Sequence, residues 1–170
     1  VYYISAYSDL LRTDKIRPGD PINIVVPTGN FGNILAAYYA GKMGLPIRRL
    51  ICASNRNRVL TDFIRTGVYD RNRTFYNTMS PSMDILISSN LERLLYDLSG
   101  GDAAEIRGMM ASLAKEGRYQ VTEGMREAIQ SQFSAGWCDD RQTAEVIADT
   151  FRRHGYLLDT HTAVAMHVYR

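Results

Sequence analysis

Val25-Val26-Pro27-Thr28-Gly29-Asn30-Phe31-Gly32-Asn33 is the stretch from which the architecture of this 170-residue chain is best derived. The residues that lead into it, 22–26, are mostly apolar and β-branched, which predicts a strand buried on both faces. Pro27 lacks a backbone donor and therefore predicts the end of that strand. Gly29 and Gly32 permit positive φ and a close approach of the backbone to a ligand. We therefore expect a buried strand that runs into a glycine loop.

A helix over residues 34–43 is predicted to follow the loop, with Asn33 or a neighbour as its cap. Free amide N–H groups at a helix start favour an anion, most often phosphate. The loop lacks the Gly-Lys-Ser/Thr ending of nucleoside-triphosphate loops, and it does not read Gly-x-Gly-x-x-Gly. Two glycines between a strand and a helix also suit a plain turn. On these residues alone, an anion site and a structural turn both remain open.

A second apolar strand is predicted over residues 47–53, after a stop signal at Gly44 and Pro46. Strand, helix and strand in this order predict a right-handed parallel crossover, the unit of an α/β sheet. The loop 54–57 would then leave the sheet beside the glycine loop, at the edge where ligands bind. Further helices are predicted over residues 1–12, 58–66, 83–98, 103–114, 125–133, 141–154 (apolar at 144, 147, 148 and 151) and 161–170, with an irregular segment at 68–79 and a short extended piece at 134–138.

The composition is that of an ordinary globular domain, with 45% hydrophobic and 22% charged residues. A net charge of +2 is too balanced to predict binding to nucleic acid or to a membrane surface. No apolar run reaches the roughly 18 residues of a membrane span. Cys52 and Cys138 lack metal-ligand spacing and suggest reduced thiols in a cytoplasmic protein. The three histidines show no metal-site pattern either, so we expect no metal.

The residues around the glycine loop carry a resemblance to a known family. Residues 28–33 after an apolar strand resemble the coenzyme-phosphate loop of threonine synthase, a family of fold-type II pyridoxal-phosphate (PLP) enzymes. Residues 99–155 are similar to the family only in their helical character. Other similar stretches occur in the same order along the chain: Leu50–Asn57 with Val59–Phe63, Ser80–Ile85 with Ser88–Leu94, and Asp159–Val164.

The resemblance implies an α/β fold with an open, mostly parallel sheet flanked by helices, similar to the β subunit of tryptophan synthase. Residues 1–98 and 156–170 would form the core of a single PLP-binding domain, and residues 99–155 would be a helical insertion. Neither end of the chain carries a clear helix start or stop signal. We therefore expect a truncated domain, the C-terminal part of a longer family protein whose N-terminal remainder is its partner.

PLP requires a phosphate cradle, a lysine that holds it covalently and a partner for its ring nitrogen. The resemblance implies that backbone N–H groups of the loop hold the phosphate, with Thr28 assisting, and that the Thr162 hydroxyl contacts the ring nitrogen. The family usually has proline where this chain has Thr160, which weakens the turn before Thr162. The predicted cradle residues are Gly29, Asn30, Phe31, Gly32 and Asn33.

The family's covalent lysine lies N-terminal to the loop, in sequence that this chain does not contain. The lysines that are present, at 15, 42 and 115, lie in contexts typical of surface residues. We therefore expect no catalytic residue in this chain and no activity from it alone.

The resemblance implies threonine biosynthesis: the lyase reaction of O-phospho-L-homoserine and water to L-threonine and phosphate. Two alternatives stay open, another fold-type II lyase such as threonine dehydratase or a phospho-lyase, and a non-catalytic phosphate-binding module. Asn55 is a possible substrate ligand, whereas Arg56 and Arg58 are more simply part of a turn. Ser80, Ser82 and Asp84 either line the site or cap a helix, and capping is the simpler interpretation.

Overall fold

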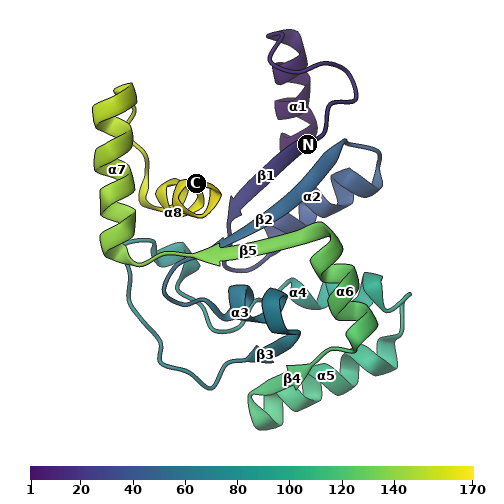
Figure 1. Cartoon of the computed structure of the whole chain (residues 1–170). Coiled ribbons are helices and arrows are strands. Elements are labelled where there is room, and N and C mark those ends of the chain that lie inside the picture. Colours follow the sequence, from purple (N-terminus) through teal and green to yellow (C-terminus); the bar gives the residue numbers. More distant parts are fainter.

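The computed structural model describes residues 1–170, which form helices around a small parallel sheet (Figure 1). The elements follow the chain in this order: α1 (Tyr2–Arg12), β1 (Ile22–Pro27), α2 (Gly32–Lys42), β2 (Ile47–Ser54), α3 (Val59–Thr66), β3 (Val68–Asp70), the 3₁₀ turn η1 (Pro81–Met83), α4 (Leu91–Leu98), α5 (Ala103–Glu116), β4 (Arg118–Gln120), α6 (Glu123–Gln132), β5 (Phe133–Trp137), α7 (Asp140–His154) and α8 (Thr160–Tyr169). None of the helices combines the length and the apolar character needed to cross a membrane.

The main sheet has the strand order β1-β2-β5, and all its pairs are parallel. Val26 lies opposite Cys52, and Cys52 lies opposite Ala135, so the three strands share one register. The predicted crossover through α2 and the predicted open α/β sheet are therefore confirmed. All three strands end at the same edge, which places the loops after β1, β2 and β5 side by side (Figure 1).

Helices cover both faces of this sheet, as the apolar strands require. On one face, α2 and α3 pack on β1 and β2, and the main core there includes Val26, Leu50 and Phe133. On the other face, α8 packs across the strands, where Ala53 and Val164 belong to a smaller cluster (Figure 1). Neighbouring strand residues such as Cys52 and Ala53 belong to different clusters because side chains alternate along a strand.

The segment predicted as a helical insertion, 99–155, is divided in the structure. Its first part, α5, β4 and α6, lies to one side of the main sheet, and β4 pairs antiparallel with β3. The rings of Tyr69 and Tyr119 stack across this pair with centroids 5.2 Å apart. The later strand β5, however, belongs to the main sheet, so this part of the segment is core. The extended piece predicted at 134–138 is β5 itself, and β3 lies at the start of the segment predicted as irregular.

Two sequence predictions about helices are wrong in detail. The helix predicted over residues 83–98 is only η1 followed by α4, because serine, aspartate and asparagine side chains between them favour local turns over a helix. In α7 the helix is present, but its buried side chains are Thr143, Val146 and Thr150, whereas Phe151 is 54% exposed. The spacing of apolar residues therefore predicted that a helix forms here, but it did not predict which of its faces packs against α8.

Candidate functional site

The loop between β1 and α2 turns at Phe31. The sequence predicted positive φ at the two loop glycines, and the structure corrects this prediction. Phe31 has φ of 65°, whereas neither Gly29 nor Gly32 has a positive φ. Phe31 is also the N-cap residue of α2, and no side chain caps this helix, so the predicted cap at Asn33 is wrong. The Phe31 ring is 1% exposed and lies 5.8 Å from the ring of Phe133, centroid to centroid. This burial stabilises a backbone conformation that a non-glycine residue adopts only at a cost.

The amide groups of this loop have no acceptor in the chain. The N–H of Thr28 still donates to the carbonyl oxygen of Ala53 at 2.8 Å, and none of the N–H groups of residues 29–34 donates to a protein atom. The loop carbonyls, in contrast, are bound: Gly29 accepts from Ser88 Oγ at 2.9 Å and Asn30 accepts from Asn90 Nδ2 at 2.8 Å. Consecutive free amides at a helix N-terminus form a binding site for an anion.

Gly29 is required by a neighbouring segment of protein. A Cβ atom added at Gly29 would lie 2.9 Å from the carbonyl oxygen of Ser82 and 3.3 Å from Cα of Met83. At Gly32 the nearest atom to an added Cβ is Nδ2 of Asn90 at 3.4 Å. Gly29 therefore lets η1 pack directly against the loop, whereas Gly32 is under no such constraint.

Two side chains of the loop are occupied within the chain. The hydroxyl of Thr28 donates to the carbonyl oxygen of Val26 at 2.7 Å, so its predicted assistance to the phosphate is limited to accepting and stays a prediction. The Oδ1 atom of Asn33 accepts from the hydroxyl of Tyr3 at 2.7 Å. Burial raises the pKa of Tyr3 to about 12, so this hydroxyl keeps its proton. The contact of α1 with the loop has no signal in the sequence, because it joins residues from separate helices.

Thr162 lies in the first turn of α8, beside the end of β1. The carboxylate of Asp159 caps this helix, accepting from the backbone N–H of His161 at 2.9 Å and of Thr162 at 3.1 Å. The hydroxyl of Thr162 also donates to Asp159, and this bond is the main reason that the pKa of Asp159 lies below its ordinary value. Thr162 shares one cavity with Pro27. We call residues 29–34, whose N–H groups have no acceptor in the chain, the amide loop. The structure thus brings Thr162 next to the strand that precedes the amide loop.

His161 connects α8 to η1. Its Nε2 atom accepts from the backbone N–H of Ser82 at 3.3 Å, and its Nδ1 atom lies 3.4 Å from Asp159. Because Ser82 also contacts Gly29, three distant segments meet at one place. His161 therefore acts as an orienting imidazole in this structure.

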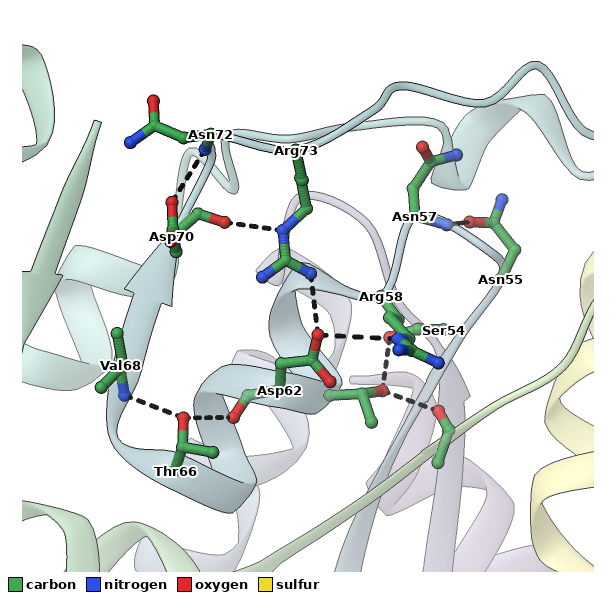
Figure 2. Close-up of polar contacts among 12 residues, drawn as sticks. Ser54, Asn55, Asn57, Arg58, Asp62, Thr66, Val68, Asp70, Asn72 and Arg73 are labelled. Atoms are coloured by element: carbon green, nitrogen blue, oxygen red, sulfur yellow. Dashed lines mark hydrogen bonds and ion pairs between the residues drawn. The ribbon is translucent and has the colours of Figure 1, made fainter. Parts of the chain in front are cut away.

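Asn55 lies after β2 in a polar knot, which we define as Asn55, Asn57, Thr78, Ser80 and Asp84. Asn55 is 2% exposed, and its Nδ2 atom donates to Asp84 Oδ1 at 2.7 Å. Its Oδ1 atom accepts from the N–H of Asn57 at 2.9 Å (Figure 2). Asp84 accepts four hydrogen bonds from this knot. Ser80 and Asp84 are the end residues of η1, but no side chain caps η1 or α4, so the predicted side-chain capping by Ser80, Ser82 and Asp84 is wrong. The predicted substrate contact of Asn55 stays a prediction, and its amide group is committed inside the chain.

The lysines have no part in these sites. Lys42 pairs with Asp97 at 2.8 Å, and Lys15 and Lys115 are exposed. No three His, Cys, Asp or Glu side chains are arranged to hold a metal ion. Cys52 and Cys138 are both free and buried, and burial raises the pKa of the Cys52 thiol to about 12.

Similar proteins are known, although no family model matches the chain. Threonine synthase-like 1 of Macaca fascicularis is 49% identical over 166 residues, which cover 97% of this chain and 22% of that protein. Threonine synthase of Pseudomonas aeruginosa is 40% identical over 170 residues, which cover 100% of this chain and 35% of that protein. The chain therefore spans between about a fifth and about a third of the length of these relatives.

Solved structures agree with the sequence comparison. The X-ray crystal structure of PLP-bound threonine synthase from Brucella melitensis matches with a TM-score of 0.92 and 43% identity, covering 99% of this chain and 35% of that one. Threonine synthase from yeast matches with a TM-score of 0.88 and 33% identity, covering 98% of this chain and 35% of that one. The sequence, the sheet and the amide loop therefore lead to one conclusion: the chain belongs to the threonine synthase family.

Proposed function

We propose that this chain holds the phosphate of PLP in an enzyme that converts O-phospho-L-homoserine and water into L-threonine and phosphate. The observation that carries the proposal is the run of amide N–H groups without an acceptor at residues 29–34. A coenzyme phosphate is a dianion with several acceptor oxygens, and it fits a seat made of backbone donors at a helix N-terminus. The PLP-bound relative from Brucella melitensis supports this assignment.

When bound, the coenzyme supplies an electron sink for carbanion chemistry, and the protein supplies position and electrostatics. In this chain the amides of Gly29 to Asn33 hold the phosphate end, and the buried Phe31 ring fixes the loop that presents them. We assign Thr162 to the ring nitrogen, and its position in one cavity with Pro27 supports this assignment. Its hydroxyl has one proton, which goes either to Asp159 or to that nitrogen, so Asp159 competes for it.

The covalent lysine and the remaining catalytic groups belong to sequence outside this chain. We infer this because Lys42 is held by Asp97 and the other two lysines are exposed, away from the amide loop. The chain alone should therefore have no synthase activity, and every functional experiment needs the full-length protein. Its cytoplasmic location stays a prediction from the two cysteines.

The substitution Asn33→Asp tests the phosphate seat with almost no change of shape. The new carboxylate still accepts the hydrogen bond from Tyr3, and a negative charge in the first turn favours the helix. It also repels the coenzyme phosphate, so we expect PLP affinity of the full-length protein to fall at least about tenfold. The affinity is measured from coenzyme absorbance retained after dialysis, and stability from urea denaturation.

The matched control is Asn77→Asp, which makes the same charge change at an exposed asparagine outside the loop. It should leave PLP affinity unchanged. Equal PLP affinity in Asn33→Asp and the unsubstituted protein would exclude the amide loop as the phosphate seat.

A second function is favoured by one observation. The relative with 49% identity is named threonine synthase-like 1, whereas the relative with 40% identity is named threonine synthase. The difference between these names keeps another fold-type II lyase as the alternative, and the example that we test is a phospho-lyase that releases phosphate and a keto acid. Incubation of the PLP-loaded full-length protein with O-phospho-L-homoserine distinguishes the two, because threonine supports the first function and a keto acid supports the second.

A further inference from the structure

A second polar cavity opens beside the loop after β2, and the amide loop does not line it. Its volume is about 510 Å³. We call it the arginine pocket, and its lining residues are Arg56, Arg58, Asp62, Asn72, Arg73, Thr74, Tyr76 and Trp137. It lies where β2 and β5 end, and β1 with its amide loop lies on the opposite side of β2. The two sites therefore use separate residues at one edge of the sheet.

Aromatic rings hold two of the three arginines in place. The guanidinium carbon of Arg56 lies 3.8 Å from the centre of the Tyr76 ring, and that of Arg58 lies 4.4 Å from the centre of the Trp137 ring. Stacking uses the flat face of a guanidinium group and leaves its edge, where the N–H donors lie, free to bind. Neither side chain donates a hydrogen bond to another protein atom. The fork of Arg56 is thus positioned but unused, whereas Arg58 uses its Nε atom in a 3.6 Å ion pair with Asp62 and keeps its two Nη groups free.

The third arginine is fixed by a shared carboxylate. Arg73 Nη1 lies 2.8 Å and Arg58 Nε lies 3.6 Å from the same oxygen of Asp62, as Figure 2 shows for this group. Arg73 Nε also donates to the carbonyl oxygen of Asp70 at 2.8 Å. Asp62 is the only acidic residue that lines the pocket, against three arginines. The pocket therefore carries two more positive charges than negative ones.

We propose that the arginine pocket binds a phosphate-class dianion, either inorganic phosphate or the phosphate group of a phosphorylated small molecule. Planar guanidinium forks match the oxygens of phosphate in a bidentate way, and charge-assisted hydrogen bonds are the strongest of this kind. The charge of a dianion balances the excess charge of the pocket. The aromatic faces are already covered by arginine, which disfavours a ligand that needs to stack. The proposal uses no residue that we assign to the coenzyme phosphate, and only its assignment to the substrate's phosphate rests on the function proposed above.

Titration calorimetry with inorganic phosphate on the PLP-loaded full-length protein tests this site, because the coenzyme then blocks the amide loop. If the protein does not retain PLP, the Asn33→Asp variant is titrated, in which the new charge blocks the loop. We expect Arg56→Gln and Arg58→Gln each to weaken phosphate binding at least about tenfold. Arg58→Lys keeps the charge but loses the fork, and it should fall between Arg58→Gln and the unsubstituted protein.

The control is Arg152→Gln, which removes one exposed positive charge outside the pocket. At 0.15 M salt it should change phosphate binding by about twofold or less, because distant surface charges are screened. Phosphate binding that is absent from the unsubstituted protein, or equal losses in Arg152→Gln and Arg58→Gln, would overturn the proposal.

Kinetics with O-phospho-L-homoserine then distinguish the two sources of the phosphate group. If the pocket takes the substrate's phosphate, Arg58→Gln raises KM with PLP content unchanged, and inorganic phosphate competes with the substrate. If the pocket takes free phosphate, KM stays the same in Arg58→Gln and phosphate does not compete. Both results support the site. The first assigns it to the substrate of the reaction, and the second assigns it to free phosphate as an effector.

Discussion

The loops that follow β1 and β2 leave the same edge of the sheet but treat their polar groups in opposite ways. After β1 the carbonyl groups are bound and the amide N–H groups are free. After β2 the side chains of Asn55 and Asn57 are buried and bonded to Thr78, Tyr76 and Asp84. The first loop keeps backbone donors available, and the second uses its asparagine donors to fix a neighbouring segment.

This difference separates a ligand site from a structural one better than residue type does. The first N–H groups of any helix lack a partner within the helix, but here the free donors already begin at Gly29, before α2 starts, which enlarges the donor set that can face an anion. The left-handed Phe31 lies in the first loop, whereas the second has no non-glycine residue with positive φ. The asparagines after β2 hold the knot together in the structure, and the predicted substrate contact of Asn55 stays a prediction.

The largest effect is expected at the knot, from Asp84→Ala. This change removes the acceptor of four hydrogen bonds. It leaves the backbone N–H of Thr78 and one amide hydrogen of Asn57 without a partner, whereas Asn55 keeps Thr78 and Ser80 as acceptors. Leaving buried donors unbonded is costly, so the free energy of unfolding should fall by about 3 kcal/mol, measured by urea denaturation. Glu127→Ala, at an exposed position in α6, is the control and should cost about 0.5 kcal/mol or less. A loss of that small size in Asp84→Ala would show that the knot is not structural.

A pair of glycine substitutions compares the two ends of the first loop. Gly29→Ala places a Cβ atom 2.9 Å from the Ser82 carbonyl oxygen, whereas Gly32→Ala meets only Asn90 Nδ2 at 3.4 Å. We expect Gly29→Ala to lower the free energy of unfolding by about 1–3 kcal/mol through overpacking, and Gly32→Ala by less than about 1 kcal/mol. Thermal denaturation of both variants measures this. Equal stability would mean that η1 does not pack on Gly29 in solution.

The sequence predicted the sheet of this protein well because its signals are local. Apolar strands, the stop at Gly44 and Pro46, and a helix between strands are each contained in a few neighbouring residues, and the parallel crossover follows from general handedness. The failures are contacts between distant residues. Phe31 takes the left-handed conformation because its ring packs on Phe133, about a hundred residues away in sequence.

The candidate site follows the same rule: its local part could be predicted from the sequence, and its contacts between distant residues could not. The loop between β1 and α2 is continuous in sequence and lies where the sequence predicts it, although the prediction assigned its geometry to the glycines. Its role in holding phosphate stays a proposal. The arginine pocket was missed, because Arg58 looks like a turn residue until Trp137 is placed beneath it. The helix predicted over 83–98 failed partly for the same reason: besides the local turn preference of its polar residues, Asp84 is bonded to the distant Asn55 and Asn57.

The third effect, smaller than those at the knot and at Gly29, concerns the N-terminal cap of α8. Asp159→Ala removes the acceptor for the N–H groups of His161 and Thr162, which should cost about 1 kcal/mol of unfolding free energy. Asp102→Ala is a matched control, since Asp102 caps α5 through Ala104 and Glu105. Both variants should lose similar stability in urea denaturation. Only Asp159→Ala should also shift the absorbance of bound PLP in the full-length protein, because it frees the Thr162 hydroxyl. A shift in neither would remove Thr162 from the coenzyme site.

The smallest effect is the acid dependence of the same cap. The hydrogen bond from Thr162 is the main cause that lowers the pKa of Asp159 in the folded protein. The stabilisation by this carboxylate is therefore complete above its unfolded pKa of about 3.9, and it is lost as the pH falls through its folded pKa. Thr162→Val removes that bond and raises the pKa of Asp159 toward its ordinary value. The difference in unfolding free energy between pH 5 and pH 3 (roughly either side of that pKa) should therefore be smaller in Thr162→Val. Urea midpoints at several pH values measure it, and the same acid dependence in both proteins would mean that the two side chains are not bonded in solution.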